Sequence, residues 1–324
     1  MATPQRVLIT GGRDVGGLTA FAAGLSEGFT ALGIPIEVVS PGRILKRWRE
    51  LRDPSVLKIL STAAVFAAPI ARRGICVAHG VPRADVQGWC RMAAILGSFK
   101  LANSCSGSPL VAVSDYVAAH LRATFNLRVD AVIRNPVQLS FLKPIDESGA
   151  RQYLTYVGRL LPAKNVHRLL PAMCDLQKEN PGLRVCVIGD GPQREALQRL
   201  FQTDPPIEFT GSLDADAVRR YLRRTRVFVS GNEMEPFGIT YLEALSQGCA
   251  VAMPACGGGL EIALPLVGTK VHLLPLSFDR EGCLNALRSA LKLSTIPISL
   301  SAYEPKAVAE AYRELGCSLH VTRN

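Results

Sequence analysis

The sequence predicts an α/β protein built from two domains, each with a doubly wound parallel sheet. Short apolar runs alternate with longer segments whose apolar residues recur at helical spacing, which is typical of parallel strands joined by crossover helices. A polar stretch with proline and glycine, residues 143–152, interrupts the alternation once, and a strand followed by a glycine-bearing loop begins each half. With 324 residues, 48% of them hydrophobic, the chain is long enough to bury two cores.

The first half, residues 1–145, is expected to form one domain. Residues 18–32 have helical apolar spacing, and Ser114 is a natural N-cap for a helix that begins near Asp115. The strand-like runs are 7–10, 34–39, 63–68, 75–78, 110–113 and 129–133.

The second half repeats the alternation, and we place its domain at residues 146–300. A last helical pattern near 303–316 is expected to pack back on the first domain, and the ligand is expected between the two domains. The expected strands are 153–157, 183–188, 207–209, 227–229, 249–253 and 271–276. The expected helices are 166–179, 193–201, 215–224 and 240–247.

Cysteine usage and hydropathy indicate a reducing compartment. The nine cysteines are odd in number, scattered and never spaced as CxxC, which argues against a disulfide framework or a zinc site. The chain enters a strand-like run directly, without a secretion signal, and holds no run of eighteen uncharged apolar residues. We therefore expect a cytoplasmic protein without a membrane-spanning helix.

Basic charge is concentrated in the first half. The formal net charge is +10, and residues 1–145 hold 17 Lys and Arg against 8 Asp and Glu. This imbalance indicates an anionic partner or an anionic surface. We expect no nucleic acid, because the chain has no basic platform interleaved with aromatic residues and no DNA-reading motif.

The densest basic segment is RILKRWRELR, residues 43–52. Ile44, Trp48 and Leu51 follow i, i+4, i+7 spacing and are surrounded by Lys and Arg, a pattern that suits a helix on an acidic membrane. The same pattern suits a solvated helix whose apolar edge packs on its own domain. The sequence leaves both interpretations open.

The segment EPFGITYLE, residues 235–243, describes an anion site. A proline and Gly238 make a bend before a helix, so backbone N–H groups near Gly238 and Ile239 lie at a helix N-terminus that favours phosphate. Glu235 precedes that terminus, and Glu243 lies about two turns into the helix. Carboxylates beside an anion need hydroxyl partners, and a sugar joined to a diphosphate offers both. A surface loop followed by an amphipathic helix is the alternative.

Two other strand-end loops fit a phosphate ligand. In GGRDVGG, residues 11–17, Gly16 and Gly17 allow close backbone approach to a phosphate or sugar, although the loop does not match GxGxxG. In VGRLLPAK, Arg159 and Lys164 can neutralise a diphosphate without a metal. Each loop by itself also fits a tight turn or solvated cations.

IGDGP, residues 188–192, is a further glycine turn after a strand, and CVAHGVP puts His79 at a strand end. A structural role is an alternative for both.

Taken together, these segments resemble a known family. VGRLLPAK, VIGDGPQREAL, IEFTGS and EPFGITYLEALSQGCAV occur in this order at close to expected intervals, as in family 4 of the glycosyltransferases. That family comprises retaining, nucleotide-sugar-dependent enzymes of GT-B fold, with two Rossmann-like domains facing a central cleft. The resemblance is strong over residues 151–265 and weaker through VLITGGRDVGG, VAHG, VAVSDY and IRNPV.

The resemblance implies roles for individual residues. Arg159 and Lys164 match the pair that binds the donor diphosphate and stabilises its leaving-group charge. Glu235 matches the carboxylate that contacts the transferred sugar, Glu243 the one that binds the ribose hydroxyls, and His79 looks like a strand-end His near the donor sugar. The other implied donor-binding residues are Gly16, Gly17, Gly158, Gly189, Asp190, Phe237, Gly238, Ile239 and Thr240.

The resemblance thus implies a retaining hexosyltransferase acting on a glycan or lipid-linked acceptor in bacterial polysaccharide or glycolipid synthesis. No metal or other cofactor is expected, and the location is cytoplasmic or peripheral on the inner face of the membrane. The alternatives are a sugar-nucleotide epimerase or phosphorylase of the same fold, and a non-catalytic nucleotide-sugar-binding or membrane-binding module. Phosphorylases are normally much longer, and a dead site has no need of all four charged residues.

Three departures from the family pattern stand out. Asn165 replaces the glycine that usually follows the lysine, Arg134 replaces a usual proline, and the first half is short, which puts acceptor choice in doubt.

Overall fold

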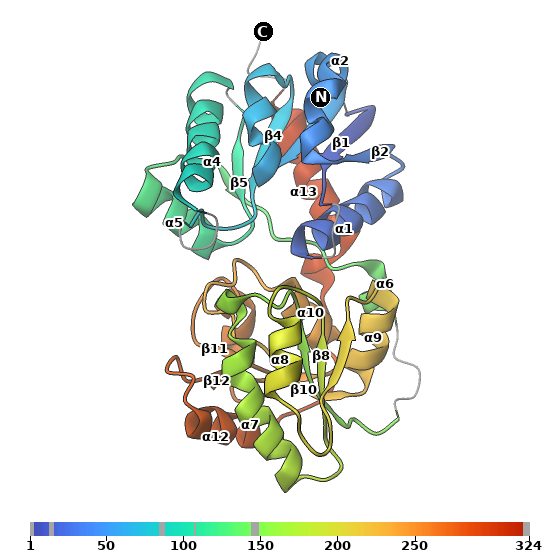
Figure 1. Ribbon diagram of the computed structural model, residues 1–324. Coiled ribbons are helices and arrows are strands. Elements are labelled where there is room, and N and C mark those ends of the chain that lie inside the picture. Colours follow the sequence, from blue (N-terminus) through green and yellow to red (C-terminus); the bar gives the residue numbers. More distant parts are fainter. Residues whose placement is uncertain (1–2, 13–15, 84–87, 107, 144–148, 320–324) are drawn as a thin grey trace. The chain divides into compact units, whose positions relative to one another are not determined.

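The computed structural model describes residues 3–12, 16–83, 88–106, 108–143 and 149–319 (Figure 1). The chain divides into two compact units, unit 1 from Met1–Leu139 with Ser301–Asn324, and unit 2 from Ser140–Leu300. Each unit contains a six-stranded sheet in which all neighbouring strands run parallel. The predicted α/β class with two doubly wound sheets is confirmed.

The sheet of unit 1 has the order β2-β1-β3-β4-β5-β6, with helices packed against it. Its strands are β1 (Arg6–Thr10), β2 (Ile36–Val39), β3 (Val56–Ser61), β4 (Gly74–Ala78), β5 (Leu110–Ala112) and β6 (Ala131–Val132). Its α-helices are α1 (Gly17–Ala31), α2 (Trp48–Arg52), α4 (Trp89–Leu101), α5 (Asp115–Phe125) and α13 (Pro305–Ser318). Shorter helical segments are η1 (Pro41–Arg47), η2 (Thr62–Ile70), η3 (Ala102–Ser106) and η6 (Ser301–Tyr303).

One strand of unit 1 is displaced from its predicted position. We expected a strand at 63–68, but that segment lies in the 3₁₀-helix η2, and the strand is β3, which precedes it. The apolar run of β3 is interrupted by Lys58. This lysine is fully buried, and its Nζ donates hydrogen bonds to the carbonyls of Asp53 and Arg72. Burial lowers the pKa of Lys58 to about 7. A lysine in the middle of a short apolar run conceals a central strand.

The basic segment 43–52 is not one helix. It comprises the end of η1 and the short helix α2, and both Ile44 and Leu51 are fully buried, whereas Trp48 is 52% exposed. The interpretation that all three apolar residues contact a membrane is therefore wrong for Ile44 and Leu51, which are not accessible. Those two side chains pack on their own unit, as the alternative interpretation expected.

The C-terminal helix α13 packs against α1 within unit 1, and Figure 1 shows the red helix beside the blue one. A Cβ at Gly28 would lie 2.0 Å from the Pro305 carbonyl oxygen, so only glycine allows this approach. The N-cap predicted for α5 is also confirmed, because Ser114 Oγ accepts from Val117 N at 3.1 Å.

The sheet of unit 2 has the order β12-β11-β10-β7-β8-β9. Its strands are β7 (Tyr153–Val157), β8 (Arg184–Ile188), β9 (Glu208–Gly211), β10 (Thr225–Val229), β11 (Ala250–Pro254) and β12 (Val271–Leu274). Its helical segments are α6 (Leu139–Leu142), η4 (Pro162–Lys164), α7 (Val166–Glu179), α8 (Arg194–Leu200), α9 (Ala215–Arg223), α10 (Ile239–Ser246), α11 (Leu260–Ala263), η5 (Leu264–Leu266) and α12 (Arg280–Ala290).

The apolar side of α7 packs with the strands and α12 into one buried cluster that includes Leu169, Met173 and Leu287. The loops that follow β7 and β10 are thereby fixed on a rigid support. Within the described residues, no helix has the length and apolar character needed to cross a membrane.

Candidate functional site

The loops after β7 and β8 pack backbone against backbone. Gly158 N donates to Ile188 O at 2.9 Å, and Leu160 N donates to Asp190 O at 2.8 Å. A Cβ at Gly189, where φ is 132°, would lie 1.9 Å from the Gly158 carbonyl oxygen. Close packing of the two loops is thus a sufficient reason for glycine at position 189, and it fixes the start of the loop that carries Arg159 and Lys164.

Lys164 and Glu235 come together although they lie on different loops. Lys164 Nζ is 3.2 Å from Glu235 Oε2, and Asn232 Nδ2 donates to the same oxygen at 2.5 Å. Both charged side chains are partly buried, with 25% of Lys164 and 19% of Glu235 exposed. The predicted cation and carboxylate therefore share one site at the carboxyl ends of β7 and β10, where open α/β sheets bind ligands.

Arg159 lies on the same loop as Lys164 but is exposed. Its side chain makes no hydrogen bond or ion pair with any described residue, while its carbonyl accepts from Tyr156 Oη at 3.0 Å. Within the described part of the chain, the guanidinium is thus a cation without a protein partner, on the same loop as Lys164 and five residues before it.

Asn165 is more than a tolerated replacement for glycine. Its backbone is left-handed, with φ 54° and ψ 24°, which explains why glycine suits this position and why Asn, the residue that most readily adopts this conformation after glycine, also fits. Its Nδ2 donates to Gly231 O at 3.0 Å and to Glu233 Oε2 at 3.3 Å. Asn165 therefore ties the lysine loop to the loop that carries Glu235.

We expect Asn165→Ala to lower the free energy of unfolding by about 2–3 kcal/mol, because it removes a buried hydrogen bond and forces a left-handed alanine. Asn165→Gly keeps the backbone conformation and should cost about 1 kcal/mol less. Urea unfolding of the two variants checks this. Equal losses would mean that the left-handed conformation contributes nothing to the difference.

The N-terminus of α10 lies directly after Glu235. Gly238 is its N-cap with φ 98°, Phe237 and Ile239 are buried, and Thr240 is partly buried. A Cβ at Gly238 would lie 2.5 Å from Cδ2 of Tyr241, so the ring of Tyr241 closes one side of this turn.

A second glycine turn, which the sequence analysis missed, holds the same loop from the other side. Gly258 N donates to Glu235 O at 2.7 Å. A Cβ at Gly257, where φ is 80°, would lie 2.9 Å from that oxygen. The run of three glycines after β11 was the available signal, together with Asn232 three residues before Glu235.

Glu243 lies within α10 and is 7% exposed. No described residue donates a hydrogen bond to its carboxylate, and burial raises its pKa to about 7. Burying a carboxylate without a hydrogen-bond donor lowers the stability of the fold. Such a carboxylate is typical of a binding site in which hydroxyl groups of a ligand donate the missing hydrogen bonds.

The predicted residues His79, Gly16 and Gly17 belong to unit 1. His79 follows β4, and its ring packs edge-on against Phe21 with centroids 4.4 Å apart. Its Nε2 is enclosed and has no partner among the described residues, and burial lowers its pKa to about 3, so the ring is neutral. At the start of α1, a Cβ on Gly16 or Gly17 would meet nothing within 4 Å, which leaves room for close approach.

Asp190 accepts from Gly191 N at 2.7 Å and pairs with Arg194 at 3.1 Å, so its carboxylate already has partners within its own turn. No cluster of three or more His, Cys, Asp or Glu that could hold a metal ion occurs in the part of the chain that the structure describes.

The fold agrees with that of known proteins. Both units have the Rossmann-like arrangement of the GT-B fold, and HepE of Anabaena in complex with UDP-glucose matches the chain with a TM-score of 0.67, 17% identity and 98% coverage of both chains. Residues 141–294 match the family model described as Glycosyl transferases group 1. This segment makes up nearly all of unit 2 and just under half of the chain.

Curated glycosyltransferases also match parts of the chain. The sulfoquinovosyl transferase SQD2 of Arabidopsis thaliana is 32% identical over 193 residues, covering 57% of this chain and 36% of that protein. A GDP-mannose-dependent alpha-mannosyltransferase of Mycolicibacterium smegmatis is 36% identical over 117 residues, covering 36% of this chain and 28% of that protein. The chain thus matches about a third of the length of each of these two relatives.

Proposed function

We propose that the protein is a retaining glycosyltransferase that moves a sugar from a nucleotide-diphosphate donor to a hydroxyl of a glycan or lipid-linked acceptor. The observation that carries this proposal is the ion pair between Lys164 and Glu235, 3.2 Å apart, whose carboxylate partner lies directly before the N-terminus of α10 in the segment that matches the family model. A cation, a carboxylate and free helix N–H groups at one point suit a ligand with both phosphate and hydroxyl groups.

In this proposal, Lys164 and Arg159 bind the diphosphate and stabilise the negative charge that develops on it as the sugar leaves. Arg159 is free to do so because its guanidinium has no protein partner among the described residues. The backbone N–H groups at Gly238 and Ile239 add a fixed positive potential. The step is heterolytic: the bond from the anomeric carbon to the phosphate oxygen breaks, and its electron pair leaves with the nucleoside diphosphate. The acceptor oxygen forms the new bond to the anomeric carbon on the same face, and its proton passes to the departing phosphate oxygen.

Glu235 and Glu243 have different roles in this proposal. Glu235 accepts hydrogen bonds from hydroxyl groups of the transferred sugar. Lys164 and Asn232 hold the Oε2 atom of Glu235 in place for this role. Glu243 accepts hydrogen bonds from the ribose hydroxyl groups, which supply the hydrogen-bond donors that its buried carboxylate lacks among the described residues. Neither carboxylate acts as a covalent nucleophile. As the resemblance implies, we also propose that His79 contacts the donor sugar and that Gly16 lies at the diphosphate.

The test of the proposed reaction is the configuration of its product. A retaining enzyme supplied with an α-linked donor gives an α-linked product, which the anomeric coupling in proton NMR reports. A β-linked product would contradict retention. Conversion of the donor sugar without any acceptor would instead identify an epimerase.

We expect transfer to be independent of a metal ion, because Lys164 and Arg159 supply the positive charge that a diphosphate needs. Turnover should change by less than about twofold when EDTA replaces added Mg²⁺. A loss that Mg²⁺ or Mn²⁺ restores would show that a cation shares this role.

We further propose that the protein acts at the cytoplasmic face of the membrane in bacterial polysaccharide or glycolipid synthesis. The exposed part of the basic segment supports this. Trp48 is 52% exposed, and the guanidinium carbons of Arg49 and Arg52 lie 5.7 Å and 5.9 Å from its ring centroid. Flotation with anionic liposomes that is unchanged in a Trp48→Ala, Arg49→Ala, Arg52→Ala variant would rule out this contact.

A further inference from the structure

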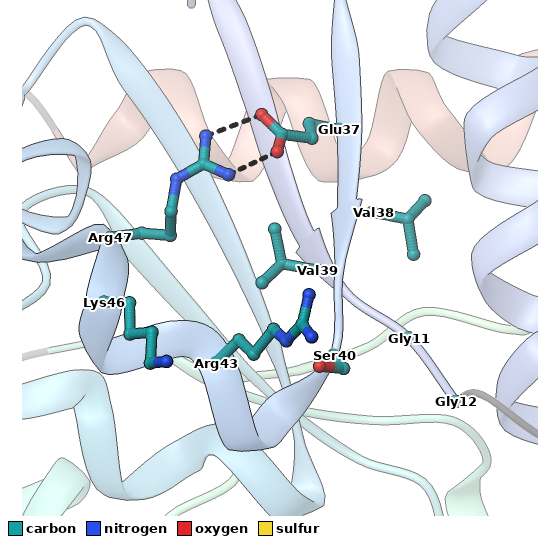
Figure 2. Close-up of a pocket in the computed structure, with 9 residues that line it drawn as sticks. All are labelled: Gly11, Gly12, Glu37, Val38, Val39, Ser40, Arg43, Lys46 and Arg47. Atoms are coloured by element: carbon teal, nitrogen blue, oxygen red, sulfur yellow. Dashed lines mark hydrogen bonds and ion pairs between the residues drawn. The ribbon is translucent and has the colours of Figure 1, made fainter.

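Unit 1 contains a pocket that the proposed donor site does not use. It has a volume of about 450 Å³ and lies at the carboxyl ends of β1 and β2, between the glycine-rich loop and η1. Figure 2 shows its lining, with Gly11 and Gly12 on one side and Ser40, Arg43 and Lys46 on the other. Carboxyl ends of parallel strands are where α/β sheets bind ligands, and the volume is in the range of small-molecule sites.

The acidic side chain in the wall of the pocket is already neutralised. Glu37 pairs with Arg47, whose Nη2 lies 2.7 Å from its Oε2, and with Arg6 at 3.2 Å. Glu50 completes the cluster by pairing with the same two arginines. The hydrogen bond from Arg47 lowers the pKa of Glu37, so the cluster stays ionised, with two cations balanced by two anions.

Two further cations of the pocket have no such balance. Arg43 and Lys46 are exposed, and among the described residues no carboxylate lies within ion-pair distance of either. Figure 2 shows both side chains beside the pocket, while Arg47 turns to Glu37. Ser40 also lines the pocket and makes no capping hydrogen bond to η1. An arginine fork, an ammonium and a free hydroxyl together form a set of donors for a phosphate group.

We propose that this pocket binds a phosphate group carried by the acceptor. That the pocket binds phosphate does not depend on the proposed function. That the acceptor carries this phosphate does depend on it. Arg43 binds two phosphate oxygens, Lys46 binds the third, and Ser40 donates its hydroxyl. The phosphate belongs either to a soluble phosphorylated sugar or to the headgroup of a lipid.

Calorimetric titration with inorganic phosphate tests the site. Wild type should bind it, and Arg43→Ala or Lys46→Ala should each raise the Kd by at least about tenfold. Lys100→Ala removes the same charge from an exposed position of α4 in the same unit, outside the pocket, and its Kd should equal that of wild type. An unchanged Kd in the Arg43→Ala, Lys46→Ala double variant, or an equal loss in Lys100→Ala, would overturn the proposal. So would a loss in Lys164→Ala alone, since phosphate would then bind in unit 2.

A second arm identifies the source of the phosphate. Vesicles of phosphatidylcholine with phosphatidic acid are compared with vesicles of phosphatidylcholine alone, using wild type and the two pocket variants. Binding that needs phosphatidic acid, Arg43 and Lys46 supports a lipid headgroup, and phosphate binding without vesicle binding supports a soluble acceptor. Affinity for nucleotide sugars should be unchanged in both pocket variants, so a failed donor site and a failed phosphate pocket give different results.

Discussion

Replacing Lys164 with alanine is expected to lower turnover by at least about 10²-fold, the effect of removing one preorganised donor from a developing oxyanion. Arg159→Ala should act with a similar magnitude, since both cations face the same diphosphate in our proposal. Lys164→Ala also frees Glu235 from its ion pair at 3.2 Å, so its donor affinity should fall as well. Initial rates at saturating donor measure the first effect, and donor titration measures the second.

Lys178→Ala is the matched control, because this exposed lysine lies on α7, which follows the same loop. Its turnover should equal that of wild type. Normal turnover in both Lys164→Ala and Arg159→Ala would contradict the assignment of the diphosphate site.

Glu243→Gln is expected to increase stability and to weaken donor binding at the same time. The folded-state pKa of Glu243 is about 7, raised by burial from the usual 4.5. For a group raised in this way, the stabilising contribution is complete below pH 4.5 and is lost as the pH rises through about 7. At pH 8 the wild type therefore bears a cost of up to about 3 kcal/mol that glutamine does not have.

Chemical unfolding of both proteins at pH 8 and at pH 4 measures this difference. The advantage of Glu243→Gln should be present at pH 8 and disappear toward pH 4, while its donor affinity at pH 8 should fall by about tenfold or more. Glu195→Gln, at an exposed position of α8, should change neither property. A Glu243→Gln variant that is less stable at pH 8 would show that the carboxylate has a stabilising partner.

The sequence predicted those parts of unit 2 in which local signals agree. Alternating apolar runs located all six of its strands, and the four charged motif residues point to two loops that the structure brings within 3.2 Å of one another, through Lys164 and Glu235. The reason is that βα units place successive strand ends on one edge of the sheet, so the spacing in the chain becomes proximity in space.

Other features depend on contacts that are distant in the sequence. β3 was missed because the carbonyls that bind Lys58 cannot be inferred from its position, and the basic segment 43–52 was read as one helix although tertiary packing buries Ile44 and Leu51. The helices α4 and α12 were not predicted either. The role of the glycines at 257–259 becomes visible only when their loop meets the backbone of Glu235.

The roles of Asn165 and of the pocket beside β2 also required the structure. Asn165 was read as a departure from the family pattern, but its left-handed backbone and its hydrogen bond to Gly231 explain its presence. Arg43 and Lys46 were seen only as part of a charge run, because the ion pairs that neutralise their neighbour Arg47 involve Glu37, ten residues away in the sequence.

Titration of wild type and Glu235→Ala with a panel of nucleotide-diphosphate sugars, followed by a transfer assay with the donor that binds, tests whether the protein transfers a sugar from such a donor and whether Glu235 contacts that sugar. We predict that wild type binds one class of nucleotide sugar and transfers the sugar of that donor. Glu235→Ala should bind the corresponding nucleoside diphosphate without its sugar as well as wild type does, but should lose at least about 10²-fold in transfer. Transfer by Glu235→Ala at the wild-type rate would exclude the proposed role of Glu235, and no binding of any nucleotide sugar by wild type would exclude the proposed donor.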